Sequence, residues 1–116
     1  EVYNFPASTC SLKVRITFCE QGLNWLGHKL STGGTDHLKP EYLILNPNEF
    51  VPTLINDGYP IVDSWLIIEY LDEVFSETKL TPNNAKERVR KHWWPGYSEE
   101  KLTGAVRYPT FEKTLM

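Results

Sequence analysis

The first part of the chain alternates between a strand-like and a helix-like hydrophobic pattern. Val2 to Phe5 alternates apolar and polar residues and predicts a short strand that ends at Pro6. A helix is predicted to begin at Ser8 or Thr9, either of which can cap it, and to end at Gly22. The apolar residues that recur there at helical spacing are Leu12, Ile16 and Cys19, with Val14 and Phe18 beside them.

The middle of the chain predicts another strand and helix, followed by a hairpin. Asn24 to Leu30 is a second strand, Ser31 to Asp36 is a loop rich in Gly, Ser and Thr, and Lys39 to Leu45 is a short helix. The next two strand-like segments flank Asn56-Asp57-Gly58, whose Asp-Gly pair suits positive φ and predicts a tight turn. These two strands span Val51 to Ile55 and Pro60 to Val62.

The strongest helical pattern of the chain begins at Asp63-Ser64. Its apolar stripe consists of Ile67, Ile68, Leu71, Val74 and Phe75, and the residues expected on the outside are Glu69, Asp72 and Glu73. The predicted order of elements is therefore βαβαββα. This order builds a mixed four-stranded sheet with helices on both faces, so we predict an α/β fold of the thioredoxin-like arrangement.

The C-terminal part of the chain predicts the start of a separate, all-α domain. Pro and Asn residues mark a linker at 78–84, after a thioredoxin-like domain of residues 1–77. Ala85 to Trp94 predicts the first turns of a new helix, which we expect Pro95-Gly96 to break. Residues 85–116 are too few to form a second core by themselves, so we expect them to be the truncated start of a helical domain.

Composition argues against several classes of function. The net charge of −3, from 12 basic and 15 acidic side chains, provides no basic patch for phosphates, so no nucleic-acid partner is expected. No stretch approaches the roughly 20 apolar residues that span a bilayer, and no signal-peptide pattern is present, so we expect no membrane contact and a cytoplasmic location. His28, His37 and His92 show no metal-ligand spacing among themselves or with the cysteines, so no metal is expected.

The segment Ser8-Thr9-Cys10-Ser11 is the first candidate for chemistry. It lies at the predicted turn from strand into helix, where backbone amides and the helix dipole favour an anionic ligand such as a thiolate. A hydroxyl group there can donate a hydrogen bond to a substrate sulfur and lower the pKa of its thiol, whereas a cysteine there can form a mixed disulfide. The structural alternative makes Ser8 and Thr9 ordinary N-caps and Cys10 a small packing residue.

Two further candidates lie at the start of a strand and at the start of a helix. If the Val51-Pro52 bond is cis, the backbone of Val51 turns outward and can pair with an extended peptide ligand. Asp63-Ser64 offers an acceptor for an ammonium group and donors for a carboxylate, a pattern typical of an amino-acid receptor. The structural alternatives are a trans proline on an edge strand and a simple helix cap.

The ordered set of motifs resembles the N-terminal domain of cytosolic glutathione transferases from Val2 to about Lys91. The serine and cysteine at the first turn resemble those of the zeta and beta classes, and the whole segment also resembles the bacterial beta-etherase type and its fungal relatives. The segments that carry the resemblance are Tyr3-Asn4-Phe5, Ser8-Thr9-Cys10-Ser11, Asn46-Pro47, Val51-Pro52-Thr53-Leu54, Asp63-Ser64 and Ile67-Ile68-Glu69-Tyr70-Leu71-Asp72-Glu73.

The resemblance implies that glutathione is the co-substrate and lies along the loops that carry these motifs. Its cysteine would pair with Val51 beside a cis Pro52, and its γ-glutamyl end would bind Asp63 and Ser64. Ser8 would activate the thiol for attack on a hydrophobic, electrophilic small molecule. The other residues that the resemblance assigns to the glutathione site are Thr9, Lys39 and Phe50.

Cys10 is the rival catalytic residue, and a cysteine at this place favours thiol transfer or reductase chemistry over conjugation. A third possibility is a non-catalytic interaction domain that has kept the transferase fold. Two departures bear on this choice: Asn48-Glu49-Phe50 stands where a glycine and a lysine or glutamine are usual, and Trp65 replaces a smaller residue. The first departure leaves His37, Lys39 or Asn48 to hold the glycyl carboxylate.

Family members carry a helical second domain that supplies the hydrophobic-substrate pocket and much of the dimer interface. The resemblance therefore implies a homodimer for the full-length protein. We expect the chain of 116 residues to bind glutathione yet to turn over conventional electrophiles poorly or not at all.

Overall fold

The structure is a computed structural model, and it describes residues 1–31, 33 and 35–106. Thr32 and Gly34 of the predicted loop, and residues 107–116 of the predicted second domain, lie outside the described residues. The chain divides into two compact units, Glu1–Leu80 and Thr81–Met116.

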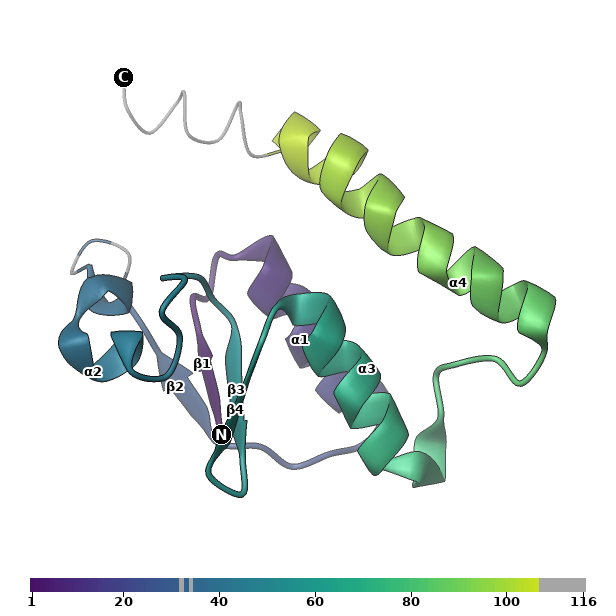
Figure 1. Cartoon of the computed structure of the whole chain (residues 1–116), viewed down its shortest axis with the longest axis horizontal. Helices are drawn as coiled ribbons and strands as arrows, with labels where there is room; N and C mark the ends of the chain where they lie inside the picture. The colour runs from purple at the N-terminus through teal and green to yellow at the C-terminus, as the bar shows by residue number, and fades with distance from the viewer. Residues whose placement is uncertain (32, 34, 107–116) are drawn as a thin grey trace. The chain divides into compact units, whose positions relative to one another are not determined.

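The first unit is built on a mixed four-stranded sheet of order β2-β1-β3-β4 (Figure 1). The strands are β1 (Val2–Asn4), β2 (Gly27–Lys29), β3 (Thr53–Asn56) and β4 (Tyr59–Val62). Strand β1 runs parallel to β2 and antiparallel to β3, and β3 pairs with β4 through a two-residue turn at Asp57 and Gly58, both of which have positive φ. The sheet confirms the predicted thioredoxin-like fold.

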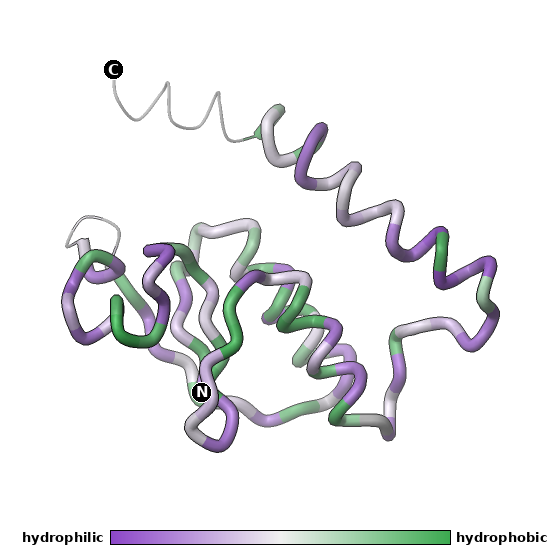
Figure 2. The backbone as a smooth tube through the Cα atoms, in the orientation of Figure 1, coloured by the Kyte–Doolittle hydropathy of each residue, from purple (hydrophilic) through white to green (hydrophobic). Residues whose placement is uncertain are grey.

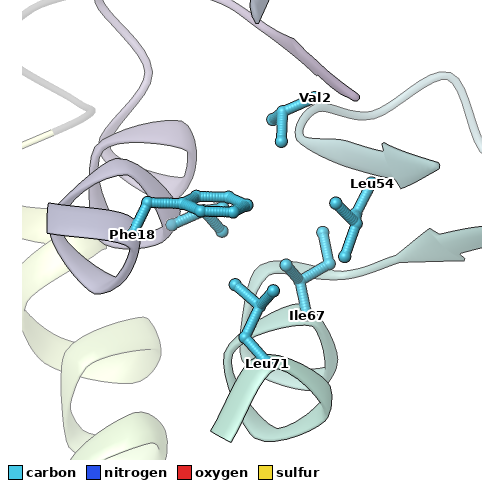
Figure 3. Packing of buried hydrophobic residues seen from close by; sticks show 6 residues of the cluster. Val2, Phe18, Leu54, Ile67 and Leu71 are labelled. Atoms are coloured by element: carbon cyan, nitrogen blue, oxygen red, sulfur yellow. The ribbon is translucent and has the colours of Figure 1, made fainter. Parts of the chain in front are cut away.

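Helices α1 (Thr9–Glu20) and α3 (Ser64–Val74) lie side by side on one face of the sheet, and α2 (Pro40–Leu43) lies on the other (Figure 1). Two 3-10 turns, η1 (Asp36–Leu38) and η2 (Ser76–Thr78), complete the unit. The hydrophobic core fills the space between the sheet and the helix pair (Figure 3). Its buried residues are Val2, Val14, Phe18, Leu54, Ile67 and Leu71.

Helix α1 buries two of the apolar residues that indicated it in the sequence, Val14 and Phe18, and exposes the other three. Leu12 and Ile16 are 45% and 50% exposed, and Cys19 is exposed as well. The buried residues are Ser11, Val14, Thr17 and Phe18. Apolar residues occur on more than one side of this helix, and the face that packs against the sheet and α3 tolerates two small hydroxyl residues. The hydroxyl of Thr17 donates to the carbonyl of Lys13 at 3.0 Å, which satisfies it inside the helix.

Only part of the apolar stripe predicted for helix α3 is buried in the structure. Ile67 and Leu71 are buried, whereas Val74 and Phe75 are exposed. Asp72, predicted to lie outside, is buried because its Oδ1 accepts hydrogen bonds from the Leu80 amide at 2.6 Å and from Nε2 of Gln21 at 3.1 Å. A carboxylate can be buried at low cost when donors surround it, and the hydrophobic pattern does not reveal such donors.

In the second unit, helix α4 (Ala85–Tyr97) is capped by Asn84, whose Oδ1 accepts from the Lys86 amide at 2.8 Å. The predicted break at Pro95-Gly96 is wrong, because the helix continues to Tyr97 and leads into the π-helix η3 (Ser98–Thr103). The rings of Trp93 and Tyr97 stack at 5.0 Å across the proline, a contact that requires the helical turn. None of the residues of α4 is buried, and Figure 2 shows that most of this helix is hydrophilic.

Candidate functional site

The sheet register brings three loops of the first unit to one end of the sheet. Thr53 at the start of β3 pairs with Tyr3 near the end of β1 and with Val62 at the end of β4. The β1–α1 turn, the α2–β3 loop and the β4–α3 turn are therefore neighbours (Figure 1). The strongest sequence-predicted candidates, at Ser8, Val51 and Asp63, lie on these three connections.

The β1–α1 turn presents a hydroxyl and a thiol at the beginning of a long helix. Ser8 is the N-cap of α1, and its Oγ accepts a hydrogen bond from the Ser11 amide at 3.1 Å. Capping uses the oxygen as an acceptor and leaves the hydroxyl proton available to a ligand, so the cap and a catalytic role are compatible. Thr9 is exposed, and Cys10 is half-buried in the first helical turn.

Arg15, which the sequence reasoning did not single out, holds this turn from the side of the helix. Its Nη2 donates to the carbonyl of Pro6 at 2.9 Å, and its Nη1 donates to Oδ1 of the buried Asn4 at 3.1 Å. The Ser8 amide adds a bond to the carbonyl of Phe5 at 3.1 Å. Nothing in the helical periodicity distinguishes Arg15 from a solvated surface arginine, because its acceptors are loop and strand groups.

The α2–β3 loop carries Phe50, Val51 and Pro52. The Val51–Pro52 peptide bond is cis, as the resemblance implies. Pro52 is buried, Val51 is half-buried and Phe50 is 70% exposed. Glu49 has a φ of 64°, a left-handed conformation that a glycine adopts more easily than a glutamate. The departure from the family pattern at Glu49 thus falls on the residue whose backbone favours glycine.

The β4–α3 turn places a carboxylate at the start of α3. Oδ1 of Asp63 accepts hydrogen bonds from the Trp65 amide at 2.9 Å and from the Leu66 amide at 3.3 Å, which makes Asp63 the N-cap. Asp63 is exposed, and Ser64 beside it is buried. The Asp63 side chain therefore offers negative charge to solvent while it caps the helix, as an ammonium receptor requires.

Trp65, the second departure from the family pattern, lies in the first turn of α3 and contacts a lysine of α1. The ammonium of Lys13 on α1 lies 4.6 Å from the centre of a Trp65 ring. This is a cation–π contact. It places a large aromatic side chain next to the turn that carries Asp63, and Nε1 of Trp65 is buried without a hydrogen-bond partner among the described residues.

The three candidates for holding a glycyl carboxylate are in different situations. Nζ of Lys39 lies 2.6 Å from Oδ1 of Asp36, and this exposed ion pair lowers the pKa of Asp36 and raises the pKa of Lys39. The ring of His37 packs edge-on against Phe5 at 5.3 Å, and its Nδ1 is buried without a partner among the described residues. The backbone amide of Asn48 donates to Oδ1 of Asn46 at 3.0 Å. His37 is thus the candidate that the structure places beside the β1–α1 turn.

A groove of about 260 Å³ lies beside α2. Among its described lining residues are Tyr3, Leu30, Asp36, Lys39, Tyr42 and Leu45, and Ser8, Val51 and Asp63 are not among them. Lys39 is therefore paired with Asp36 and lines the groove beside α2.

The described residues form neither a metal-ligand cluster nor a membrane-spanning helix. No group of three or more His, Cys, Asp or Glu side chains in this part of the chain is arranged to hold a metal ion. Among the helices at 1–31, 33 and 35–106, none combines the length and the apolar character needed to cross a bilayer.

Comparisons with known proteins agree with the fold. A sequence profile of the family described as "Glutathione S-transferase, N-terminal domain" matches residues 7–74, more than half of the chain. Glutathione S-transferase 1 of Dianthus caryophyllus is 38% identical over 89 residues, covering 77% of this chain and 40% of that protein. A maleylacetoacetate isomerase of Pseudomonas aeruginosa is 35% identical over 94 residues, covering 78% and 44% respectively.

Among solved structures, the beta-etherase LigF from Sphingobium matches with a TM-score of 0.80 at 29% identity, covering 85% of this chain and 42% of that one. The chain thus spans less than half the length of these relatives. The family predicted from the motifs is confirmed by both the sequence profile and the solved structures. The chain belongs to the glutathione S-transferase family, whose N-terminal domain it contains.

Proposed function

We propose that this chain carries the glutathione-binding site of a glutathione transferase, which activates the glutathione thiol for attack on a hydrophobic, electrophilic small molecule. The observation that supports it is the register that gathers Ser8, Val51 and Asp63 at one end of the sheet. An exposed carboxylate, strand-like backbone and a hydroxyl at a helix start match the ammonium, the peptide backbone and the thiol of glutathione.

In this proposal each part of glutathione has its own receptor. The γ-glutamyl end binds Asp63 and Ser64, and the cysteinyl backbone pairs with Val51 beside Pro52. The hydroxyl of Ser8 donates to the thiolate. The remaining contacts are proposed for Thr9, Lys39 and Phe50.

We propose three parts for the chain: a glutathione-binding domain, a linker and the start of a helical domain. Residues 1–77 form the glutathione-binding domain, 78–84 form a linker, and 85–116 begin a helical domain. The acceptor pocket and a homodimer interface belong to a full-length protein that includes that helical domain.

Calorimetric titration of glutathione at neutral pH tests the site. Asp63→Asn keeps an oxygen that can cap α3 but removes the charge, so we expect the Kd for glutathione to rise roughly tenfold or more. Asp57→Asn removes the same charge from the β3–β4 turn at the opposite end of the sheet and should leave the Kd unchanged. Ser8→Ala should raise the pKa of the bound thiol, measured by the thiolate absorbance.

Absence of saturable binding to the wild-type chain would refute the proposed site and favour the non-catalytic interaction domain. Equal effects of Asp63→Asn and Asp57→Asn would show that net charge, rather than a receptor at Asp63, controls the affinity.

A second candidate function is glutathione-dependent thiol transfer through Cys10. The observation in its favour is the half-buried Cys10 thiol in the first turn of α1, on the same connection as Ser8. The Cys10 thiolate would attack a glutathionyl disulfide, take up the glutathionyl sulfur and release the substrate thiolate. A free glutathione thiolate would then attack this mixed disulfide, which returns Cys10 and releases glutathione disulfide.

Mass spectrometry after incubation with glutathione disulfide distinguishes the two functions. The thiol-transfer function predicts an adduct that Cys10→Ser abolishes and that Cys19→Ser leaves intact, because Cys19 is an exposed thiol near the other end of the same helix. An adduct that depends on Cys19 alone would exclude this function.

A further inference from the structure

We infer that Tyr42 and Asn46 are positioning residues for glutathione: they hold the carbonyl of Phe50 so that the amide of Val51 is directed toward the ligand. This inference rests on the proposed glutathione site. It adds residues that do not touch the ligand themselves and act through the loop that does.

The carbonyl oxygen of Phe50 accepts two hydrogen bonds from side chains. One comes from the hydroxyl of Tyr42, and the other comes from Nδ2 of Asn46 at 2.9 Å. A carbonyl oxygen has two lone pairs, so both are used and the direction of this carbonyl is fixed from two sides. The loop residue that precedes Val51 is therefore held at its backbone, while its own side chain is exposed.

Thr53 completes the network and determines which groups donate. Oγ1 of Thr53 lies 2.7 Å from the Tyr42 hydroxyl and accepts from Nδ2 of Asn46 at 3.1 Å. Since the Tyr42 proton goes to the Phe50 carbonyl, the Thr53 hydroxyl donates to the Tyr42 oxygen. Oδ1 of Asn46 accepts from the Asn48 amide at 3.0 Å. In this network the donors of Tyr42, Asn46 and Thr53 are all used, and the side-chain oxygen of each accepts a hydrogen bond.

The network is shielded from water. Tyr42, Asn46 and Thr53 are 4%, 1% and 0% exposed, respectively. Burial raises the pKa of Tyr42, so its hydroxyl remains protonated and continues to donate at neutral pH. Buried polar groups that satisfy one another fix a single geometry, because any alternative leaves a group unpaired at a cost of about 1–3 kcal/mol.

The planarity of the peptide unit transmits this geometry to the ligand site. The carbonyl of Phe50 and the N–H of Val51 belong to one trans peptide plane and point in opposite directions. The carbonyl points toward the buried side chains of Tyr42 and Asn46, so the N–H of Val51 points away from them. That direction presents the N–H to the cysteinyl backbone of a glutathione bound along this loop.

The test compares two Tyr→Phe substitutions that each remove one hydroxyl. Tyr42→Phe removes a donor to the Phe50 carbonyl. Tyr70→Phe removes the acceptor of a 2.8 Å bond from Nδ2 of Asn56, in a half-buried position near the β3–β4 hairpin. Tyr42→Phe also removes the acceptor of the Thr53 hydroxyl, so it loses two hydrogen bonds where Tyr70→Phe loses one. Tyr70→Phe therefore controls for the loss of a tyrosine hydroxyl elsewhere in the first unit, and the readouts below are local to the α2–β3 loop and its ligand.

The first readout needs no ligand. The amides of Asn48 and Glu49 donate to Oδ1 and to the backbone carbonyl of Asn46, at 3.0 and 3.1 Å. In Tyr42→Phe we expect their hydrogen exchange to accelerate about fivefold or more, because the loop loses the hydrogen bond to the Phe50 carbonyl, whereas Tyr70→Phe should leave it unchanged.

The second readout is the calorimetric Kd for glutathione. We expect Tyr42→Phe to raise it severalfold and Tyr70→Phe to leave it unchanged. Unchanged exchange and unchanged Kd in Tyr42→Phe would overturn the inference, and so would an equal loss of affinity in Tyr70→Phe. If the wild-type chain fails to bind glutathione, the proposed function and the role of the network toward glutathione both fail, and the exchange data still show whether Tyr42 holds the loop.

Discussion

In the first unit, α1 and α3 each bury one face between themselves and the sheet, whereas in the second unit none of the 13 residues of α4 is buried. All three helices have a side-chain N-cap, provided by Ser8, Asp63 and Asn84. The helices therefore differ little in how they begin and greatly in what packs against them.

This difference separates local from tertiary sources of helix stability. Helix α4 is supported by its Asn84 cap and by aromatic contacts within one turn, such as the stack of Trp93 on Tyr97 at 5.0 Å. Helix α1 has no comparably clear local pattern, and its buried face is set by the sheet and α3. We expect substitutions in the first unit to change the stability of the whole unit, and those in α4 to have local effects.

The largest expected effect contrasts a core residue with an exposed apolar one. Ile67→Ala should lower the free energy of unfolding by about 2–5 kcal/mol, because it leaves a cavity beside Leu71 and Leu54. Val89→Ala in α4, where the side chain is 70% exposed, should change it by about 0.5 kcal/mol or less. Urea unfolding followed by far-UV circular dichroism measures both. Similar losses would contradict the distinction between the units.

A smaller effect is expected at the buried carboxylate of Asp72. Asp72→Ala removes the acceptor for the Leu80 amide and for Gln21, so we expect a loss of about 1–3 kcal/mol in the same unfolding experiment. Glu73→Ala, one position further along α3 and exposed, is the matched control and should have little effect. A harmless Asp72→Ala would show that the C-terminal end of the first unit does not need this anchor.

The smallest effect is expected in the α2–β3 loop, where the tertiary structure overrides a local backbone preference. Glu49 has a φ of 64°, and Glu49→Gly should relieve about 1 kcal/mol of backbone strain in the folded state. The greater conformational entropy of glycine stabilises the unfolded chain and offsets part of this gain. We expect a net gain below about 1 kcal/mol. Glu49→Gln keeps the strain and removes only the charge, so it should not raise the melting temperature. A clear loss of stability in Glu49→Gly would show that the Glu49 side chain itself stabilises the loop.

Much of the fold could be predicted from short-range signals. The hairpin turn followed from Asp57-Gly58, and the two central residues do have positive φ. Strand β2 is shorter than predicted, Gly27–Lys29 within the predicted Asn24 to Leu30, because it pairs with β1, which is itself three residues long. The predicted break at Pro95 was wrong, because the helix continues through the proline to Tyr97 and the rings of Trp93 and Tyr97 stack across it.

The residues of the candidate site also fall into those that the sequence identified and those that only the structure revealed. The residues on the three connections were identified from the sequence because caps, an X-Pro bond and an Asp-Ser pair leave local marks. Arg15 and Tyr42 were not, since their partners are carbonyls and side chains that come close only when the chain folds. Thr53 belonged to a recognised motif, but the motif did not reveal its contact with the Tyr42 hydroxyl. Asn46 belonged to a recognised motif, but the motif did not reveal its bond to the Phe50 carbonyl.

The sequence by itself determined the order of elements, the starts of the helices near Ser8 and Asp63 and the hairpin turn, because these depend on residues within a few positions of one another. Only the tertiary structure decided which face of α1 is buried, why Asp72 can lie inside the first unit, and how the loop before Val51 is held. These features depend on contacts between residues far apart in the chain, such as Gln21 with Asp72. The hydrophobic pattern of one segment carries no information about the partners that another segment will bring.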